Sequence, residues 1–205
     1  MPENRVALGG RYLSIATSVR AYNGLFLPLH GSHQGVNAAV AVEAVVNFVP
    51  DASLDDGVIA EGFANAVVPG RLEALRPEEP GAPVIVLDVA HNPDGASALA
   101  GSLVEAFAFE RAVVVLGILG DKDYKGILTE IARIPCTVVA TQAKTVRSVL
   151  PHELMQAANE IGLECEVIDD VASAVKRALE MSAPGDIVCI TGSHYVVGEA
   201  RSLLL

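Results

Sequence analysis

The fold is decided by the stretch Val84-Ile85-Val86-Leu87-Asp88-Val89-Ala90-His91-Asn92-Pro93-Asp94-Gly95. An apolar run typical of a buried strand leads into a polar turn, and Pro93 is placed to open a helix. The turn carries Asp88, His91 and Asn92. Ligands of an open α/β sheet bind beyond the carboxyl ends of its strands, so we expect the functional chemistry at this turn. Asn92 is also an ordinary capping residue, and both interpretations can hold together.

Apolar runs alternate with helical patterns from this stretch to the end of the chain. Strands are predicted at 84–88, 113–119, 137–141, 165–169 and 186–191. Helices are predicted at about 94–109, 124–133, 151–161 and 170–182, with a short one near 198–204. Such alternation is typical of βαβ units. Residues 83–205 therefore predict an α/β, Rossmann-like domain with a mostly parallel sheet.

Residues 1–78 have a different pattern, which predicts a β-meander followed by two helices. The predicted strands are Arg5–Leu8, Tyr12–Thr17 and Leu25–Leu29, joined by turns at Gly9-Gly10 and Asn23-Gly24. The predicted helices cover about 34–48 and 55–66, and the first has Ala and Val on nearly every face, which favours burial on most sides. A meander with two helices makes a poor core, so we expect an exposed apolar surface within residues 1–50. The proline-rich segment 76–83 is the predicted linker.

The composition excludes several classes of protein. A formal net charge of −11 and a pI near 4.8 argue against a nucleic-acid partner, which requires a basic surface. No apolar run reaches the length of a membrane span and no signal peptide is recognisable, so we expect no membrane partner and a cytoplasmic location. The three cysteines are far apart and form no CxxC pair, so they predict reduced thiols rather than a metal site.

Four further segments carry polar residues suited to binding a ligand. His33, Gln34 and Asn37 lie at a predicted helix start, where free N–H groups favour an anion or a polar base edge, although ordinary capping explains them as well. Arg71 follows a tight Pro-Gly turn and is suited to bidentate phosphate contact, although a lone Arg is more often solvated. The remaining two segments follow predicted strands. They are Gly117-Ile118-Leu119-Gly120-Asp121-Lys122-Asp123, in which a salt-bridged turn explains the lysine nearly as well as an anion site, and Thr191-Gly192-Ser193-His194-Tyr195, which lacks the G-x-S-x-G of a hydrolase.

Taken in order, these segments resemble the C-terminal half of folylpolyglutamate synthases and dihydrofolate synthases, in the Mur ligase superfamily. The matching patterns are Gly-x-His-Gln-x-x-Asn-Ala-Ala, Pro-Gly-Arg-x-Glu, Leu-Asp-x-Ala-His-Asn-Pro-x-Gly, Gly-x-x-x-Asp-Lys-Asp and Thr-Gly-Ser-x-Tyr-x-x-Gly-Glu. The resemblance implies ATP-dependent addition of glutamate to tetrahydrofolate, or to dihydropteroate, through an acyl phosphate. It implies nucleotide contacts from Asn37, Arg71 and Asp88. It also implies three catalytic residues, with His91 on the glutamate or phosphate side, Lys122 as an anion contact and Ser193 holding the incoming glutamate.

The phosphate-binding machinery of that family is absent from this sequence. A P-loop reads G-x-x-x-x-G-K-[ST], and the chain contains no Gly-Lys pair; it also lacks G-x-G-x-x-G. In the family, the P-loop and most Mg²⁺ ligands lie in the N-terminal half. We therefore expect residues 1–78 to be the tail of a P-loop-type central ATPase domain and residues 83–205 to be the glutamate-ligase domain. No metal ligand is predicted here, and we expect the isolated chain to be inactive without a missing N-terminal half or self-association.

Two other functions stay open from the sequence. One is a non-catalytic fragment or complementing subunit that binds nucleotide weakly or not at all. The other is half of a peptidoglycan Mur ligase, which shares Asp-x-Ala-His-Asn. Gly31-x-His33-Gln34 and Gly192-Ser193-x-Tyr195 favour the folate enzyme over the peptidoglycan enzyme.

Overall fold

The computed structural model describes residues 3–48, 54–75 and 81–205. The chain divides into two compact units, an N-terminal unit, Met1–Val68, and a C-terminal unit, Pro69–Leu205. Residues 76–80 of the predicted linker lie outside the described residues. That residues 1–78 are the tail of an ATPase domain and residues 83–205 a glutamate-ligase domain stays a prediction.

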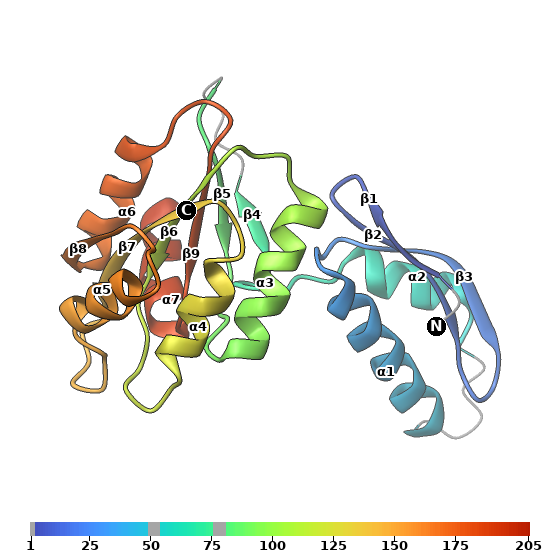
Figure 1. Ribbon diagram of the computed structural model, residues 1–205. Helices are drawn as coiled ribbons and strands as arrows, with labels where there is room; N and C mark the ends of the chain where they lie inside the picture. The colour runs from blue at the N-terminus through green and yellow to red at the C-terminus, as the bar shows by residue number, and fades with distance from the viewer. Residues whose placement is uncertain (1–2, 49–53, 76–80) are drawn as a thin grey trace. The chain divides into compact units, whose positions relative to one another are not determined.

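A six-stranded sheet forms the centre of the C-terminal unit (Figure 1). Its strands are β4 (Glu73–Leu75), β5 (Val84–Leu87), β6 (Ala112–Leu116), β7 (Cys136–Gln142), β8 (Cys165–Asp170) and β9 (Ile187–Thr191), in the order β4-β5-β9-β6-β7-β8. Only β4 runs antiparallel to its neighbour; every other pair is parallel. The five predicted strands are confirmed, and so is the mostly parallel α/β architecture.

Five helices cover the two faces of this sheet. They are α3 (Pro93–Ala106), α4 (Tyr124–Ile131), α5 (Pro151–Glu160), α6 (Val171–Met181) and α7 (His194–Leu204). Side chains alternate along a strand, and in β6 Val114 and Leu116 join the core with α3, α4 and α5, whereas Val113 and Val115 join the core with α6 and α7. Because both faces are covered, the central strands β6 and β9 are buried along their whole length, and Thr191 is their one polar residue.

Two elements differ from the sequence prediction in this unit. β4 was not predicted, because three residues are too few to show an alternating pattern. The last helix begins at His194 rather than near 198, since Ser193 caps it: the Ser193 hydroxyl accepts the N–H of Val196 at 3.2 Å. The helix start therefore lies directly beside the carboxyl end of β9.

The N-terminal unit is an antiparallel three-stranded sheet with two helices. The strands are β1 (Glu3–Ala7), β2 (Gly10–Ala16) and β3 (Ala21–Leu27), and the helices are α1 (Ser32–Phe48) and α2 (Asp56–Ala64). The predicted turn at Asn23-Gly24 is wrong: both residues lie inside β3. They sit opposite Ser14 alone, so the extra residue makes a β-bulge, and the register shifts there.

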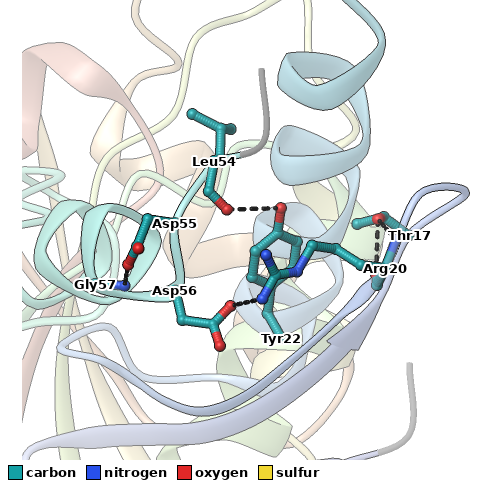
Figure 2. A network of polar contacts seen from close by, with 7 residues as sticks. All are labelled: Thr17, Arg20, Tyr22, Leu54, Asp55, Asp56 and Gly57. Carbon is teal, nitrogen blue, oxygen red and sulfur yellow. Dashed lines mark hydrogen bonds and ion pairs between the residues drawn. The ribbon is translucent and has the colours of Figure 1, made fainter. Parts of the chain in front are cut away.

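The second hairpin turn, at residues 17–20, joins β2 to β3. Its side chains contact the start of α2 (Figure 2). The Thr17 hydroxyl donates to the Arg20 carbonyl at 2.8 Å, which closes the turn. Arg20 forms an ion pair with Asp56 in the first turn of α2, and its guanidinium lies 5.1 Å from the centre of the Tyr22 ring. The Tyr22 hydroxyl donates to the Leu54 carbonyl at 3.4 Å, so polar contacts fix this end of the unit.

The prediction that the first helix is buried on most sides is wrong for this chain. One stripe of α1 packs on the sheet through Ala38, Val42 and Val46, as the 3.6-residue period requires. Val36 and Val40 on the remaining surface are 53% and 65% exposed. The predicted apolar surface within residues 1–50 is therefore present in the described part of this unit, and it lies on α1.

None of the helices in the described residues is both long enough and apolar enough to cross a membrane.

Candidate functional site

The carboxyl ends of β5, β6 and β9 bring four of the predicted site residues together in the C-terminal unit. His91 follows β5, Lys122 follows β6 and Ser193 follows β9. These three line a cavity of about 190 Å³, together with His194 and neighbouring residues. Asp88 lies beneath the same turn as His91 and is 6% exposed. The site thus stands where an open parallel sheet places its ligands.

Asp88 holds the opening turn through backbone hydrogen bonds. One carboxylate oxygen accepts the N–H of Ala90 at 2.8 Å, and the other accepts the N–H of Leu72 at 2.9 Å. The Asp88 N–H in turn donates to the Ile190 carbonyl at 3.0 Å. An ionised carboxylate can accept further hydrogen bonds beyond these two, so the geometry is compatible with a ribose hydroxyl.

His91 is oriented by the carbonyl of Val89, which lies 2.9 Å from its Nδ1 atom. A carbonyl only accepts hydrogen bonds, so Nδ1 carries the proton and Nε2 is left as the second polar atom of the ring. The His194 ring centre lies 6.0 Å from that of His91, and both rings border the cavity. Two imidazoles at one cavity can donate to an anion or exchange a proton with a bound amine.

Ser193 has its hydroxyl oxygen engaged by α7, while the hydroxyl hydrogen can still donate. The side chain is buried and caps the helix through Val196. A hydroxyl carries one donor besides its acceptor lone pairs, so Ser193 can donate toward a carboxylate in the cavity. The end of α7 that faces the cavity is its N-terminus, which favours negative charge.

The surroundings of Lys122 agree with both interpretations of the sequence, a salt-bridged turn and an anion contact. Its ammonium lies 2.9 Å from a carboxylate oxygen of Asp121, whose other oxygen lies 3.3 Å from Arg147. The hydrogen bond from Lys122 lowers the pKa of Asp121 below its usual value. The lysine also borders the cavity, so the salt-bridged turn and the anion contact are compatible.

The backbone approaches closely at Gly192, which lines the cavity. Gly192 has φ +105, a left-handed conformation that favours glycine, and a Cβ there would lie 2.5 Å from the Gly117 carbonyl oxygen. The Gly117 N–H donates to the Thr191 carbonyl at 3.3 Å. Any side chain at Gly192 would push the β6 and β9 ends apart.

Arg71 lies on the same unit, in a turn attached to the start of the Asp88 loop. The Gly70 carbonyl accepts the N–H of Val89 at 2.9 Å. Of the lysines and arginines within residues 3–48, 54–75 and 81–205, Arg71 is the one whose side chain has no hydrogen bond or ion pair. Its guanidinium is therefore available to an anionic ligand.

Asn37 belongs to the N-terminal unit, near the start of α1. Its amide donates to Gln34 Oε1 at 3.2 Å and the residue is exposed. The structure gives no placement of Asn37 relative to the C-terminal unit, so its predicted contact with the adenine stays a prediction.

The cysteines take no part in this site. Burial raises the pKa of Cys136 and of Cys165 to about 11, and it raises the pKa of Cys189 further. All three are free thiols, as predicted, although only Cys189 is fully buried. Among the described residues there is no group of three or more His, Cys, Asp or Glu side chains that could hold a metal ion.

Sequence reasoning missed His194, Glu73 and Arg201 as parts of the site and its support. His194 stands at a variable place in the recognised pattern, so only its position at the carboxyl end of β9 could have indicated it. Glu73 belongs to the pattern Pro-Gly-Arg-x-Glu, which gave it no role. Its hydrogen bond from Arg201 joins residues 128 positions apart. Nothing in the local pattern could have indicated that pairing.

The fold and this site define a class, the Mur ligases. Residues 70–194 match the family described as "Mur ligase, glutamate ligase domain", and the chain belongs to that family. It is 36% identical to the dihydrofolate synthase/folylpolyglutamate synthase of Mycobacterium tuberculosis, over 97% of this chain and 44% of that protein. It is 33% identical to the UDP-N-acetylmuramoyl-L-alanyl-D-glutamate–2,6-diaminopimelate ligase of Chelativorans, over 85% of this chain and 36% of that protein.

Solved structures agree with this resemblance. The M. tuberculosis folylpolyglutamate synthase complexed with ADP matches with a TM-score of 0.92 and 36% identity, over 99% of this chain and 47% of that one. The bifunctional Yersinia pestis enzyme complexed with AMPPNP and Mn ion matches with a TM-score of 0.73 and 25% identity, over 92% of this chain and 43% of that one. The predicted resemblance to a C-terminal half of folylpolyglutamate synthases is confirmed. The chain spans less than half the length of these relatives.

Proposed function

We propose that this chain is the C-terminal portion of an ATP-dependent ligase that adds glutamate to a folate, and that it is inactive alone. The observation that carries the proposal is the meeting of His91, Lys122 and Ser193 at one cavity, beside a turn that presents the unpaired Arg71. Family membership and the ADP complex of a similar enzyme support it.

The residues present fit a nucleotide and an amino acid in neighbouring positions. Arg71 would contact the phosphates of ATP and Asp88 would accept a ribose hydroxyl, while the contact of Asn37 with the base remains the one that the family resemblance implies. ATP, when bound, supplies the phosphoryl group that activates the acceptor carboxylate. We assign no Mg²⁺ ligand within the described residues and expect those ligands in the part of the ligase that has no counterpart here.

Within the cavity, His91, Lys122 and Ser193 would hold glutamate. Lys122 and the Ser193 hydroxyl are suited to its carboxylates, because both are donors near a helix N-terminus. His91 Nε2 can take a proton from the attacking amine, since its Nδ1 is fixed on the Val89 carbonyl. A cavity of about 190 Å³ accommodates a small amino acid better than a folate, which we place outside it.

The exposed face of α1 gives the reason to expect inactivity. Val36, Val40 and Phe48 are 53%, 65% and 86% exposed and lie on one helix. Apolar patches of this kind mark interaction sites. We propose that they pack against the half of a ligase that has no counterpart in this chain, which would also supply a P-loop.

The test is phosphate release from Mg-ATP in the presence of tetrahydrofolate and glutamate. We expect no turnover from the chain alone, and turnover when the N-terminal half of the M. tuberculosis enzyme is added. Arg71→Ala should reduce the restored rate at least tenfold, whereas Arg133→Ala, which breaks an exposed ion pair with Glu130 and a hydrogen bond to Ser97, should not change it.

Each other outcome contradicts a stated part of the proposal. Turnover by the chain alone would contradict the claim of inactivity. Turnover with a UDP-sugar peptide in place of the folate would identify half of a peptidoglycan ligase. If the mixture shows no turnover and the chain binds no ADP, the chain is a non-catalytic member of the family.

A further inference from the structure

The turn that carries Arg71 is held on both sides by buried backbone contacts. The Gly70 carbonyl accepts the N–H of Val89 at 2.9 Å, and the N–H of Leu72 donates to Asp88 at 2.9 Å. The Leu72 side chain is 1% exposed. The backbone before and after Arg71 is therefore fixed to the loop that follows β5.

Glu73 provides a third attachment and connects the turn to α7. One carboxylate oxygen accepts the N–H of Gly70 at 2.9 Å, and both oxygens lie 3.0 Å from Nε of Arg201. Burial alone would raise the pKa of Glu73, but the bonds from Arg201 and Gly70 outweigh it and lower that pKa. Glu73 is thus a carboxylate at neutral pH, with its plane fixed by a guanidinium.

The conformation held by these contacts is a costly one. Gly70 has φ +68, and Leu72 has φ +47, which is the one positive φ of a non-glycine residue in the described chain. A leucine in the left-handed region is sterically unfavourable and persists only where its surroundings hold it. Two such residues on either side of Arg71 turn the chain sharply and set the direction of its side chain.

The side chain so presented has no partner of its own. In the described residues every other lysine and arginine forms a hydrogen bond or an ion pair, whereas Arg71 forms none. A guanidinium binds phosphate bidentately only in a limited range of orientations. A backbone fixed at three points around an unpaired arginine therefore fits a role in orienting that arginine toward an anion.

We infer that Glu73 and Arg201 are positioning residues, which hold the Gly70–Leu72 turn so that Arg71 meets the phosphates of a nucleotide in one orientation. Neither residue touches the nucleotide itself. The inference rests on the proposed role of Arg71 in nucleotide binding, and it adds a carboxylate and an arginine to which the sequence patterns gave no role.

The test is Mg-ADP binding by the full chain, measured by isothermal titration calorimetry in a double-variant cycle. Arg71→Ala should weaken binding by about 10- to 100-fold, the range expected for a charge-assisted contact. Glu73→Gln keeps an acceptor for the Gly70 N–H but loses the charge that holds Arg201, and should weaken binding by about 3- to 10-fold. Adding Glu73→Gln to Arg71→Ala should cause no further loss beyond about twofold.

A matched control is available at the other end of the sheet. Glu166 on β8 also receives Nε of an arginine at both oxygens, Arg177 on α6, at 2.9 and 3.1 Å. Glu166→Gln removes the same kind of pair without a link to the Arg71 turn. We expect it to leave ADP affinity within about twofold of the wild type, whatever its effect on the melting temperature.

The outcomes separate the two proposals. If Glu73→Gln weakens ADP binding equally in the presence and absence of Arg71, or if Glu166→Gln has the same effect, the positioning role is wrong. If the wild-type chain binds no Mg-ADP, the assigned contact of Arg71 with the nucleotide fails and the positioning role fails with it, whereas turnover restored by the added N-terminal half would still support the proposed ligase function. Arg201→Lys provides a second variant should Glu73→Gln not fold, with the same expected dependence on Arg71.

Discussion

The two units of the chain use their apolar residues in opposite ways. In the C-terminal unit, the sheet is covered on both faces and the central strands β6 and β9 are buried throughout. In the N-terminal unit there is one small core, α2 has no buried residue, and valines of α1 face outward. An apolar fraction of 51% for the whole chain hides this difference. A complete core and an exposed apolar surface are distinguished only by where the apolar side chains lie.

The strongest test of this difference between the two units is to shorten a core side chain of the C-terminal unit. Leu116 on β6 is 0% exposed, so Leu116→Ala should destabilise the chain by about 2–5 kcal/mol through lost burial and a residual cavity. Val40→Ala on α1 removes a similar kind of atom from an exposed position and should cost less than about 0.5 kcal/mol. Urea unfolding followed by circular dichroism measures both. Equal effects would contradict the assignment of α1 as an exposed surface.

Replacing Asp88 should give the next largest loss of stability. Asp88→Asn leaves one oxygen for the N–H groups of Leu72 and Ala90, so one buried donor loses its acceptor, at about 1–3 kcal/mol. Thermal unfolding measures this cost. Asp94→Asn, on the exposed first turn of α3, is the control and should change the melting temperature little. A cost no greater than that of the control would mean that Asp88 does not hold the turn.

The stability of the C-terminal unit is expected to depend on pH through Asp186, which directly precedes β9. Burial alone would raise the pKa of Asp186, but hydrogen bonds from Ala183 and Arg111 outweigh it and lower that pKa. Since the folded-state pKa lies below the unfolded one, Asp186 stabilises the fold at neutral pH, and this contribution is lost as pH falls through the folded-state pKa. At pH 7, Asp186→Asn should therefore reduce the free energy of unfolding by about 1–2 kcal/mol and lower the melting temperature, and the difference from the wild type should shrink as pH falls through the folded-state pKa. A difference that does not change with pH would contradict the ion pair.

The smallest expected change in stability is the most informative about α1. Val40→Lys should alter stability by less than about 0.5 kcal/mol, because the side chain is 65% exposed, yet it should reduce the fluorescence of a bound hydrophobic dye. Val104→Lys on α3 starts from a similar exposure of 61% and serves as the control, with no change in dye fluorescence expected. If both variants bind dye like the wild type, α1 does not form an apolar docking surface.

The sequence predicted the sheet well because its strands are short apolar runs separated by helices of regular pattern. It failed at Asn23-Gly24, since a bulge and a two-residue turn share the same residue preferences, and the register of β2 decides between them. It could not predict β4, whose three residues depend on pairing with β5. The convergence of Asp88, His91, Lys122 and Ser193 followed from strand ends, whereas the bond from Glu73 to Arg201 depends on tertiary contact.

The central claim is that the carboxyl ends of β5, β6 and β9 form the ligand site of this chain. Titrating the ¹⁵N-labelled full chain with Mg-ADP and following backbone amide shifts tests it most directly. We predict that the largest shifts fall on residues 70–72, 88–92 and 191–195, and that Arg71→Ala suppresses them. Shifts centred on α5 and β8, or no shifts at millimolar ADP, would contradict the claim.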